Sequence, residues 1–368
     1  MKLLHNTGGH LRAAASWHSR ILSARVETRR HIGTSAHVAI TGAQPLEWLP
    51  ETQPLQNAAE YQIAAAIRCI VSWDRFSLRI NGARVFLQSA EFHYQRLPVP
   101  ELWPDIFQKF RANGFNAVSI YFFWSYHSAA PGIFDFTSPA KDVQRLLDAA
   151  KSAGLWVIAR PGPYCNAETN AGGLPLWGSD GSLGTVRTDD ATYHKAWQPW
   201  IAAIGKIIAK NQISNDGPII LTQVENELTE TRHTARDSLV IYMQQLEAAL
   251  RGAGINTPLT SNEKGMRGAA SWSSDYQDVG GAVDIYGMDS YPGGMSCTNR
   301  ASGFNVVRTY GQWFSSYTAL QPVSLPEFEG GWFSGWGGTF YDEVRDKVKF
   351  LNTAMPDANQ TVRRGTLA

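Results

Sequence analysis

Two glutamates are the residues whose positions in the sequence indicate a chemical reaction most clearly. Glu227 ends the string GPIILTQVENE at residues 217–227, and Glu327 lies in QPVSLPEFEGGW at residues 321–332. Each follows a short apolar, β-rich run and precedes glycine, polar or aromatic residues, which is typical of the carboxyl end of a buried parallel strand. Side chains at these ends of a barrel's strands point into one cavity. Two carboxyl groups facing each other there could break a glycosidic bond.

The surroundings of Glu227 support a functional role. Acidic side chains are rarely fully buried without a partner, so a glutamate that closes an apolar strand needs a reason to be there. Asn226, directly before it, adds a neutral donor of the kind that contacts a sugar hydroxyl. The chain also holds 13 Trp, 13 Tyr and 16 Phe, and indole rings at strand ends suit the C–H faces of sugars.

Alternating strand and helix patterns must position these residues. A hairpin is expected through Asn81-Gly82, and amphipathic helices over 102–114, 141–154, 192–211, 237–254 and 306–320. Seven parallel strands are predicted over 85–91, 115–123, 155–160, 218–225, 257–261, 283–288 and 322–328. This order predicts an α/β fold with a parallel sheet, open or closed.

A closed (β/α)8 TIM barrel is favoured over an open sheet. Polar and aromatic residues gather at the carboxyl ends of nearly all the strands: Glu91, His93, Tyr121, Trp124, Asn166, Glu168, Asn226, Glu227, Asn262, Glu263, Tyr291 and Glu327. No Gly-rich phosphate loop follows the first strand, which argues against a dinucleotide-binding oxidoreductase. No eighth strand is readable after Glu327, so the barrel is expected to be open at its closing edge.

Composition excludes several classes of partner. Of the 368 residues, 43% are hydrophobic and 18% are charged, with a formal net charge of +1. This balance gives no case for nucleic-acid or membrane binding. Three cysteines form no disulfide framework, and the nine His are scattered without metal-ligand spacing. His93 and His127 lie near strand ends and are expected in the core or behind the site.

The first 72 residues differ from the rest and are treated as an N-terminal extension, followed by a catalytic barrel domain over 73–368. Met1 to His37 contains six Lys or Arg and one acidic residue, Glu27. Such composition is closer to an organelle transit peptide than to a secretory signal. Disorder or a misassigned gene start accounts for it as well.

Several strings resemble glycoside hydrolase family 35, with the fungal-type β-galactosidases as its nearest group. They are SAEFHYQRLPVPELWPDIFQKFRANGFNAVSIYFFWSYHSAAPGIFDF, ARPGPYCNAETNAGGLPLW, GPIILTQVENE, VDIYGMDSYP and PEFEGGWF. They occur in the family's order, from about Trp73 to about Asp342. The resemblance implies a β-galactosidase of carbohydrate metabolism that hydrolyses terminal β-D-galactosyl residues of oligo- or polysaccharides with retention.

The resemblance also implies a role for particular residues. Glu227 becomes the acid/base and Glu327 the nucleophile, with carboxyl groups about 5–5.5 Å apart. The family motif assigns the nucleophile to Glu327 and not to Glu329. For the tyrosine that lines the sugar site, Tyr291 fits the family's spacing to the nucleophile better than Tyr286 does. The substrate-binding residues that it implies are Tyr121, Asn166, Ala167, Glu168, Asn226 and Tyr291. The resemblance implies that no metal or cofactor is required. We also expect a monomer. The resemblance to the family implies secretion, although no signal peptide is visible in the sequence.

Two departures from the family bear on activity. The family takes part of its galactose pocket from an eighth strand and adds β domains after the barrel, and neither is readable in this sequence. Fungal members also pair the cysteine that corresponds to Cys297 with a later cysteine, and none follows it here. We therefore expect this chain to be a weak or inactive hydrolase. Two alternatives stay open: a galactoside-binding remnant without catalysis, and an incomplete gene product.

Overall fold

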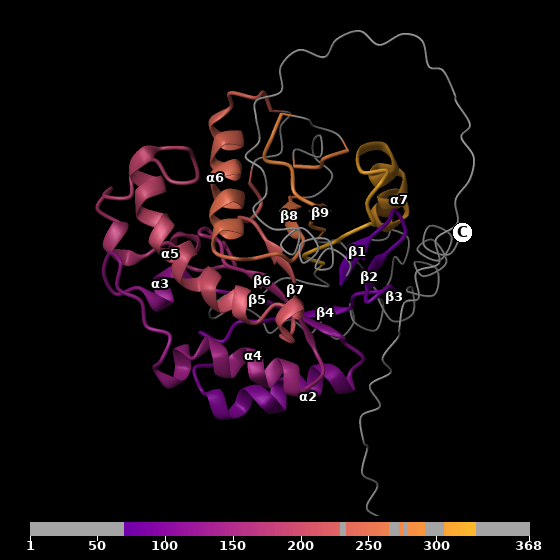
Figure 1. The fold of residues 1–368 in the computed structure, drawn as a ribbon, viewed down its shortest axis with the longest axis horizontal. Helices are drawn as coiled ribbons and strands as arrows, with labels where there is room; N and C mark the ends of the chain where they lie inside the picture. The colour runs from indigo at the N-terminus through magenta and orange to yellow at the C-terminus, as the bar shows by residue number, and fades with distance from the viewer. Residues whose placement is uncertain (1–69, 229–232, 265–271, 276–278, 291–304, 329–368) are drawn as a thin grey trace, which may run out of the picture. The chain divides into compact units, whose positions relative to one another are not determined.

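A computed structural model describes residues 70–228, 233–264, 272–275, 279–290 and 305–328 of the chain. Four short strands come first, and from residue 89 to residue 263 strands alternate with helices (Figure 1). The strands are β1 (Val71–Trp73), β2 (Leu78–Ile80), β3 (Ala83–Val85), β4 (Ser89–Phe92), β5 (Ala117–Tyr121), β6 (Trp156–Arg160), β7 (Ile219–Gln223), β8 (Leu259–Glu263) and β9 (Ile285–Met288). The helices are α2 (Trp103–Ala112), α3 (Trp124–His127), α4 (Val143–Ser152), α5 (Ala191–Lys210), α6 (Ser238–Gly252) and α7 (Asn305–Tyr317), with short 3-10 turns between them.

Local chemistry sets the helix ends that the sequence predicts. The side chains of Asp142, Asp190 and Asp237 accept backbone N–H groups at the starts of α4, α5 and α6, where four donors have no partner within the helix. Gly114 and Gly154 follow α2 and α4 with φ of 91° and 72°, a left-handed conformation that glycine adopts without steric cost. Each helix therefore ends where the next strand must begin.

The six strands β4 to β9 form one parallel sheet in sequence order. The first and last predicted strands differ from expectation. The range 85–91 divides into the end of hairpin strand β3 and the start of β4. The range 322–328 contributes one bridge, between Phe328 and Ser290, because Pro326 offers no N–H to continue the ladder.

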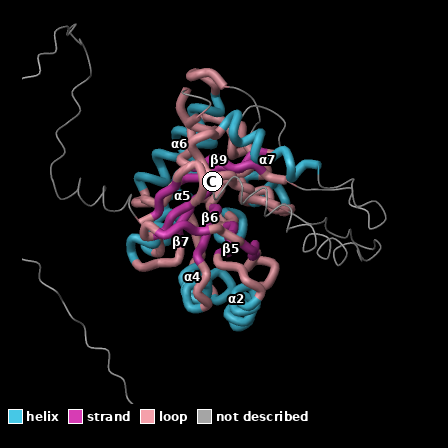
Figure 2. Tube along the Cα trace, turned by 90° about the vertical axis from the view of Figure 1, so that its right-hand side faces the viewer, coloured by secondary structure: helices cyan, strands magenta, loops and turns pink. Residues whose placement is uncertain are grey.

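The sheet curves round on itself. Adjacent strands lie about 4.8 Å apart, and the segment 324–328 lies beyond β9, five spacings from β5, or roughly 24 Å in a flat sheet. Yet the Tyr121 hydroxyl of β5 is 3.1 Å from Glu327 Oε1. Figure 2 shows the strands inside with helices around them, and α2 packs on α4 as α5 packs on α6. The fold is an α/β barrel; the eighth strand missing from the sequence pattern concerns residues outside the described ranges.

The hairpin forms a small sheet that packs on the amino-terminal end of the barrel. β1 pairs antiparallel with β2, and β2 pairs antiparallel with β3. Asn81 and Gly82, which both have positive φ, form the turn between β2 and β3, as the sequence predicts. The buried side chains of β1 and β2 share one apolar cluster with barrel residues such as Ile220 and Ile285. The opposite end of the barrel, where the strands finish, is left for polar side chains.

His127 is buried in the helix layer in its neutral form. Its Nδ1–H donates to the Asp135 carbonyl at 2.6 Å, which leaves Nε2 to accept from the Tyr94 hydroxyl at 2.6 Å. Burial lowers the pKa of His127 to about 4, against a hydrogen bond to Asp135 that raises it. The imidazole is therefore a core group, as its position near a strand end predicts.

Acid should destabilise the fold through His127. The unfolded chain binds this proton near pH 6.5 and the folded chain only near pH 4, so the stabilisation present above pH 6.5 is lost as the pH falls to 4. At about 1.4 kcal/mol per pKa unit, the loss is about 3 kcal/mol. Urea unfolding of wild type and His127→Gln at pH 7 and pH 4.5 measures it. The variant should lose less stability between these two pH values, and an equal loss contradicts the assignment.

Candidate active site

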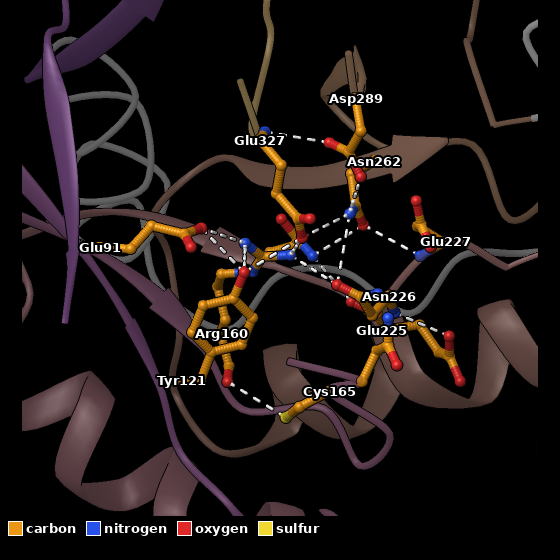
Figure 3. Close-up of polar contacts among 12 residues, drawn as sticks. Glu91, Tyr121, Arg160, Cys165, Glu225, Asn226, Glu227, Asn262, Asp289 and Glu327 are labelled. Atoms are coloured by element: carbon orange, nitrogen blue, oxygen red, sulfur yellow. Dashed lines mark hydrogen bonds and ion pairs between the residues drawn. The ribbon is translucent and has the colours of Figure 1, made fainter. Parts of the chain in front are cut away.

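Arg160 is the centre of the polar end of the barrel (Figure 3). It closes β6, and its side chain is only 2% exposed. Nη1 donates to Glu91 Oε1 at 3.1 Å and to the Tyr121 hydroxyl, and Nη2 donates to Asn226 Oδ1 and to Glu327 Oε1, both at 2.5 Å. A buried guanidinium needs such partners because its desolvation is costly. Arg160 thus joins groups from β4, β5 and two later segments.

Glu327 lies among hydrogen-bond donors. Its Oε1 accepts from Arg160, from the Tyr121 hydroxyl at 3.1 Å and from Asn262 Nδ2 at 3.2 Å. Its backbone N–H donates to Asp289 Oδ1 at 3.0 Å. Donors aimed at one carboxylate oxygen favour its ionised form and fix its direction. Three side-chain donors therefore hold this carboxyl group in one orientation.

Glu227 follows a turn of unusual backbone conformation. Glu225 and Glu227 have φ of 59° and 44°, left-handed values that cost energy for residues other than glycine. The Glu227 N–H donates to Asn262 Oδ1 at 3.1 Å, while Nδ2 of the same amide donates to Glu327. Figure 3 shows Asn262 between the two glutamates. One amide side chain thus links the segments that carry both.

Two further carboxyl groups surround Glu327. Asp289 is fully buried and also accepts from Asn262 Nδ2 at 2.6 Å; burial, and then the charge of Glu327, raise its pKa well above the usual value. Burial likewise raises the pKa of Glu91, Arg160 opposes this, and the charge of Glu327 adds to it. In both acids the proximity of Glu327 therefore disfavours a second negative charge.

The predicted sugar-binding string lies beside this centre. Asn166, Ala167 and Glu168 have φ of 55°, 46° and 48°, so the string turns sharply after β6. Arg96 Nη2 donates to the Ala167 carbonyl at 2.5 Å and lies 3.9 Å from Glu168 Oε2. Ala167 packs in one cluster with Tyr121. The structure therefore brings the string to the rim of the same site, with Glu168 half exposed.

Other predicted residues have different outcomes. Tyr291 and the alternative Glu329 lie outside the described residues, so their proposed places are untested. Tyr286, the less favoured tyrosine, stacks on Trp313 of α7 and donates to Glu263 Oε2 at 2.8 Å, on the helix side of the barrel. Of the three cysteines, the structure describes only Cys165, whose thiol is free and buried.

Sequence reasoning gave no role to Arg160 or Asp289 and left Asn262 as a strand end. A charged residue closing the apolar run LWVIAR was the signal for Arg160, as Glu227 was for its own strand.

In the described ranges no group of three His, Cys, Asp or Glu could hold a metal ion. None of the helices described is long and apolar enough to cross a membrane.

A glycine keeps the Glu327 segment close to β9. A Cβ on Gly287 would lie 2.4 Å from Pro326 Cγ and 2.9 Å from the Ser261 carbonyl oxygen. Since neither group can swing away freely, Gly287→Ala should lower the free energy of unfolding by about 1–3 kcal/mol. Gly311→Ala, in open space on α7, is the control and should stabilise by up to about 1 kcal/mol. Urea unfolding compares them, and an unchanged Gly287→Ala midpoint contradicts the packing described.

Most of this chain is similar in sequence to known proteins. Residues 77–363 match the family model for glycosyl hydrolases family 35. "Probable beta-galactosidase C" of Sclerotinia sclerotiorum (strain ATCC 18683 / 1980 / Ss-1) is 64% identical over 301 residues, covering 81% of this chain and 30% of the relative. The protein of that name in Penicillium rubens (strain ATCC 28089 / DSM 1075 / NRRL 1951 / Wisconsin 54-1255) is 66% identical over 278 residues, covering 76% and 28%. The chain therefore spans about 30% of the length of these curated relatives.

A solved structure shares the fold. The exo-beta-1,4-mannosidase Op5Man5 from Opitutaceae bacterium strain TAV5 has a TM-score of 0.55 and 18% sequence identity, over 78% of this chain and 52% of that one. At this identity the likeness concerns the barrel alone. The family match, which spans most of the sequence and both glutamate segments, shows that the chain belongs to glycosyl hydrolases family 35.

Proposed function

We propose that the protein is a retaining β-galactosidase that releases terminal non-reducing β-D-galactosyl residues by double displacement. Its family membership and the printed names of its relatives support the reaction class and the substrate. The observation that carries the proposal is the Asn262 amide, which bonds both the Glu227 backbone and the Glu327 carboxylate. Asn262 thereby joins the turn that carries Glu227 to the carboxyl group of Glu327.

Each glutamate has a distinct part in the reaction. Glu327 attacks the anomeric carbon and forms a galactosyl-enzyme ester, while Glu227 gives its proton to the leaving oxygen. Glu227 then takes a proton from water, which attacks the anomeric carbon and releases Glu327. Attack by Glu327 and then by water inverts the anomeric carbon twice, so the product keeps the β configuration. The two side chains suffice for these steps without a cofactor.

The sugar would be held by the polar groups around these glutamates. We propose Asn226 as the contact to the 2-hydroxyl, since its amide is held by Arg160 beside Glu327. Contacts to other hydroxyls are assigned to Tyr121, Asn166, Ala167, Glu168 and Tyr291. Their donors and acceptors give the site its preference for a galactosyl group, because an analogue that lacks the matching hydroxyl leaves buried polar groups unpaired.

Product stereochemistry tests the proposal. Proton NMR follows p-nitrophenyl β-D-galactopyranoside mixed with the purified protein, and β-galactose should be the first anomer to appear. Early α-galactose would show inversion and overturn the double displacement. Hydrolysis of p-nitrophenyl β-D-mannopyranoside, without hydrolysis of the galactoside, would show that the proposed substrate is wrong. Galactose binding without turnover would favour the binding-only alternative.

A further inference from the structure

Arg187 reaches from the loop before α5 to the turn that carries the proposed acid/base. Its Nε and Nη2 bond both carboxylate oxygens of Glu225, at 2.9 and 2.8 Å. Nη2 also lies 2.6 Å from the Asn226 carbonyl oxygen and 3.3 Å from that of Glu227. The guanidinium carbon lies 3.9 Å from the centre of the Tyr164 ring. One side chain thus contacts three consecutive residues of the turn.

Glu225 completes the arrangement from inside the barrel wall. Its side chain is 1% exposed, and it also accepts the Asn226 N–H at 2.7 Å and the Tyr242 hydroxyl at 3.3 Å. A carboxylate this buried needs a cationic partner, and Arg187 is the one that bonds it in two places. The pair is therefore held in one geometry.

The pair acts on a backbone that would not adopt its shape unaided. Both Glu225 and Glu227 are left-handed, and such conformations persist only where the surroundings determine them. Arg187 fixes the carbonyls of Asn226 and Glu227, and the Glu225 carboxylate accepts the N–H of Asn226. Glu327 is held by a different set of donors, on Arg160, Tyr121 and Asn262.

We propose that Arg187 and Glu225 are positioning residues for the acid/base: they set the turn from which Glu227 delivers its proton. This inference rests on the proposed function and adds two residues that do not touch the reacting atoms. Loss of the pair misplaces the proton donor and leaves the donors around the nucleophile in place. The defect should therefore grow with the leaving group's need for a proton.

Two substrates of different leaving group test the inference on the full chain. With Arg187→Lys, which keeps the charge and loses the two-pronged contact, lactose hydrolysis should fall about a hundredfold, as for a group misplaced by ~1 Å. Hydrolysis of 2,4-dinitrophenyl β-galactoside, whose first step needs little proton assistance, should fall less than about tenfold when azide accepts the galactosyl group. Equal losses on both substrates, or no loss, overturn the inference.

Two controls separate positioning from stability. Arg251 makes similar bonds, to Asp284 and to the carbonyls of Ile255 and Thr257, but before β8 at the opposite end of the barrel. Arg251→Lys should leave the lactose to dinitrophenyl ratio unchanged. Where Arg187→Lys fails to fold, the double variant R187M/E225Q removes both charges together, and the same ratio decides.

Failure of the inference and failure of the proposed function give different results. If wild type hydrolyses both substrates and only Glu227→Ala shows the leaving-group dependence, the positioning role is wrong and the function stands. If wild type hydrolyses neither, the proposed function fails first, and the inference falls with it.

Discussion

Glu327→Ala is expected to lower kcat on every β-galactoside by roughly 10⁴-fold or more, the range seen when a covalent nucleophile is removed. In the proposed mechanism Glu327 forms the ester, and the proton from Glu227 alone cannot complete the displacement. Poor and activated substrates should suffer alike, because both need the nucleophile. Steady-state rates on lactose and on an aryl galactoside measure the loss.

Glu91→Gln is the matched control for Glu327→Ala. Glu91 bonds the same Arg160 and Tyr121 groups, at 3.1 and 2.8 Å, so its change also alters the charge around Arg160. Its effect should be far smaller, because it does not attack the sugar. A loss at Glu91 as large as that at Glu327, or a Glu327→Ala variant that keeps a tenth of the rate, would contradict the assignment.

Glu227→Ala should produce a loss that depends on the leaving group. Lactose hydrolysis should fall by roughly 10²–10⁴-fold, the usual contribution of a general acid, because the departing hydroxyl must be protonated. With dinitrophenyl galactoside the ester should still form, and added azide should speed its breakdown and yield β-galactosyl azide. Rate measurements with and without azide, and the identity of the product, check this.

Glu263→Gln is the control for the acid/base variant. Glu263 closes the neighbouring strand β8 but accepts from Tyr286 on the helix side of the barrel. It should show neither the dependence on the leaving group nor the rescue by azide. Equal losses of Glu227→Ala on both substrates, without rescue, would count against a role as acid/base.

The fold followed from sequence patterns wherever one rule decided the outcome. Amphipathic helix patterns, glycines after helices and apolar runs predicted α2, α4, α5 and α6 and the central strands β5 to β8 within a few residues. The ends of the sheet were less predictable. One apolar stretch near Val85 served two sheets, and Pro326 limited pairing beside β9, which depends on tertiary contacts.

The candidate site was predictable only in part for a similar reason. Glu227 and Glu327 stood out because carboxylates closing apolar strands are unusual, and a family motif separated Glu327 from Glu329. The roles of Arg160 and Asn262 depend on how a curved sheet brings separate strand ends together, which no local pattern contains. Arg187 was still harder to foresee, because it acts from a loop on the backbone of another segment.

Covalent trapping tests the central claim most directly. In a 2-deoxy-2-fluoro β-galactoside the fluorine slows both the formation and the hydrolysis of the galactosyl-enzyme ester. A good leaving group restores the rate of formation, so the ester accumulates. Mass spectrometry of a proteolytic digest should then place the fluorosugar on Glu327. A label on Glu329 or Glu168, or no label while turnover continues, would contradict the account of Glu327 as the nucleophile.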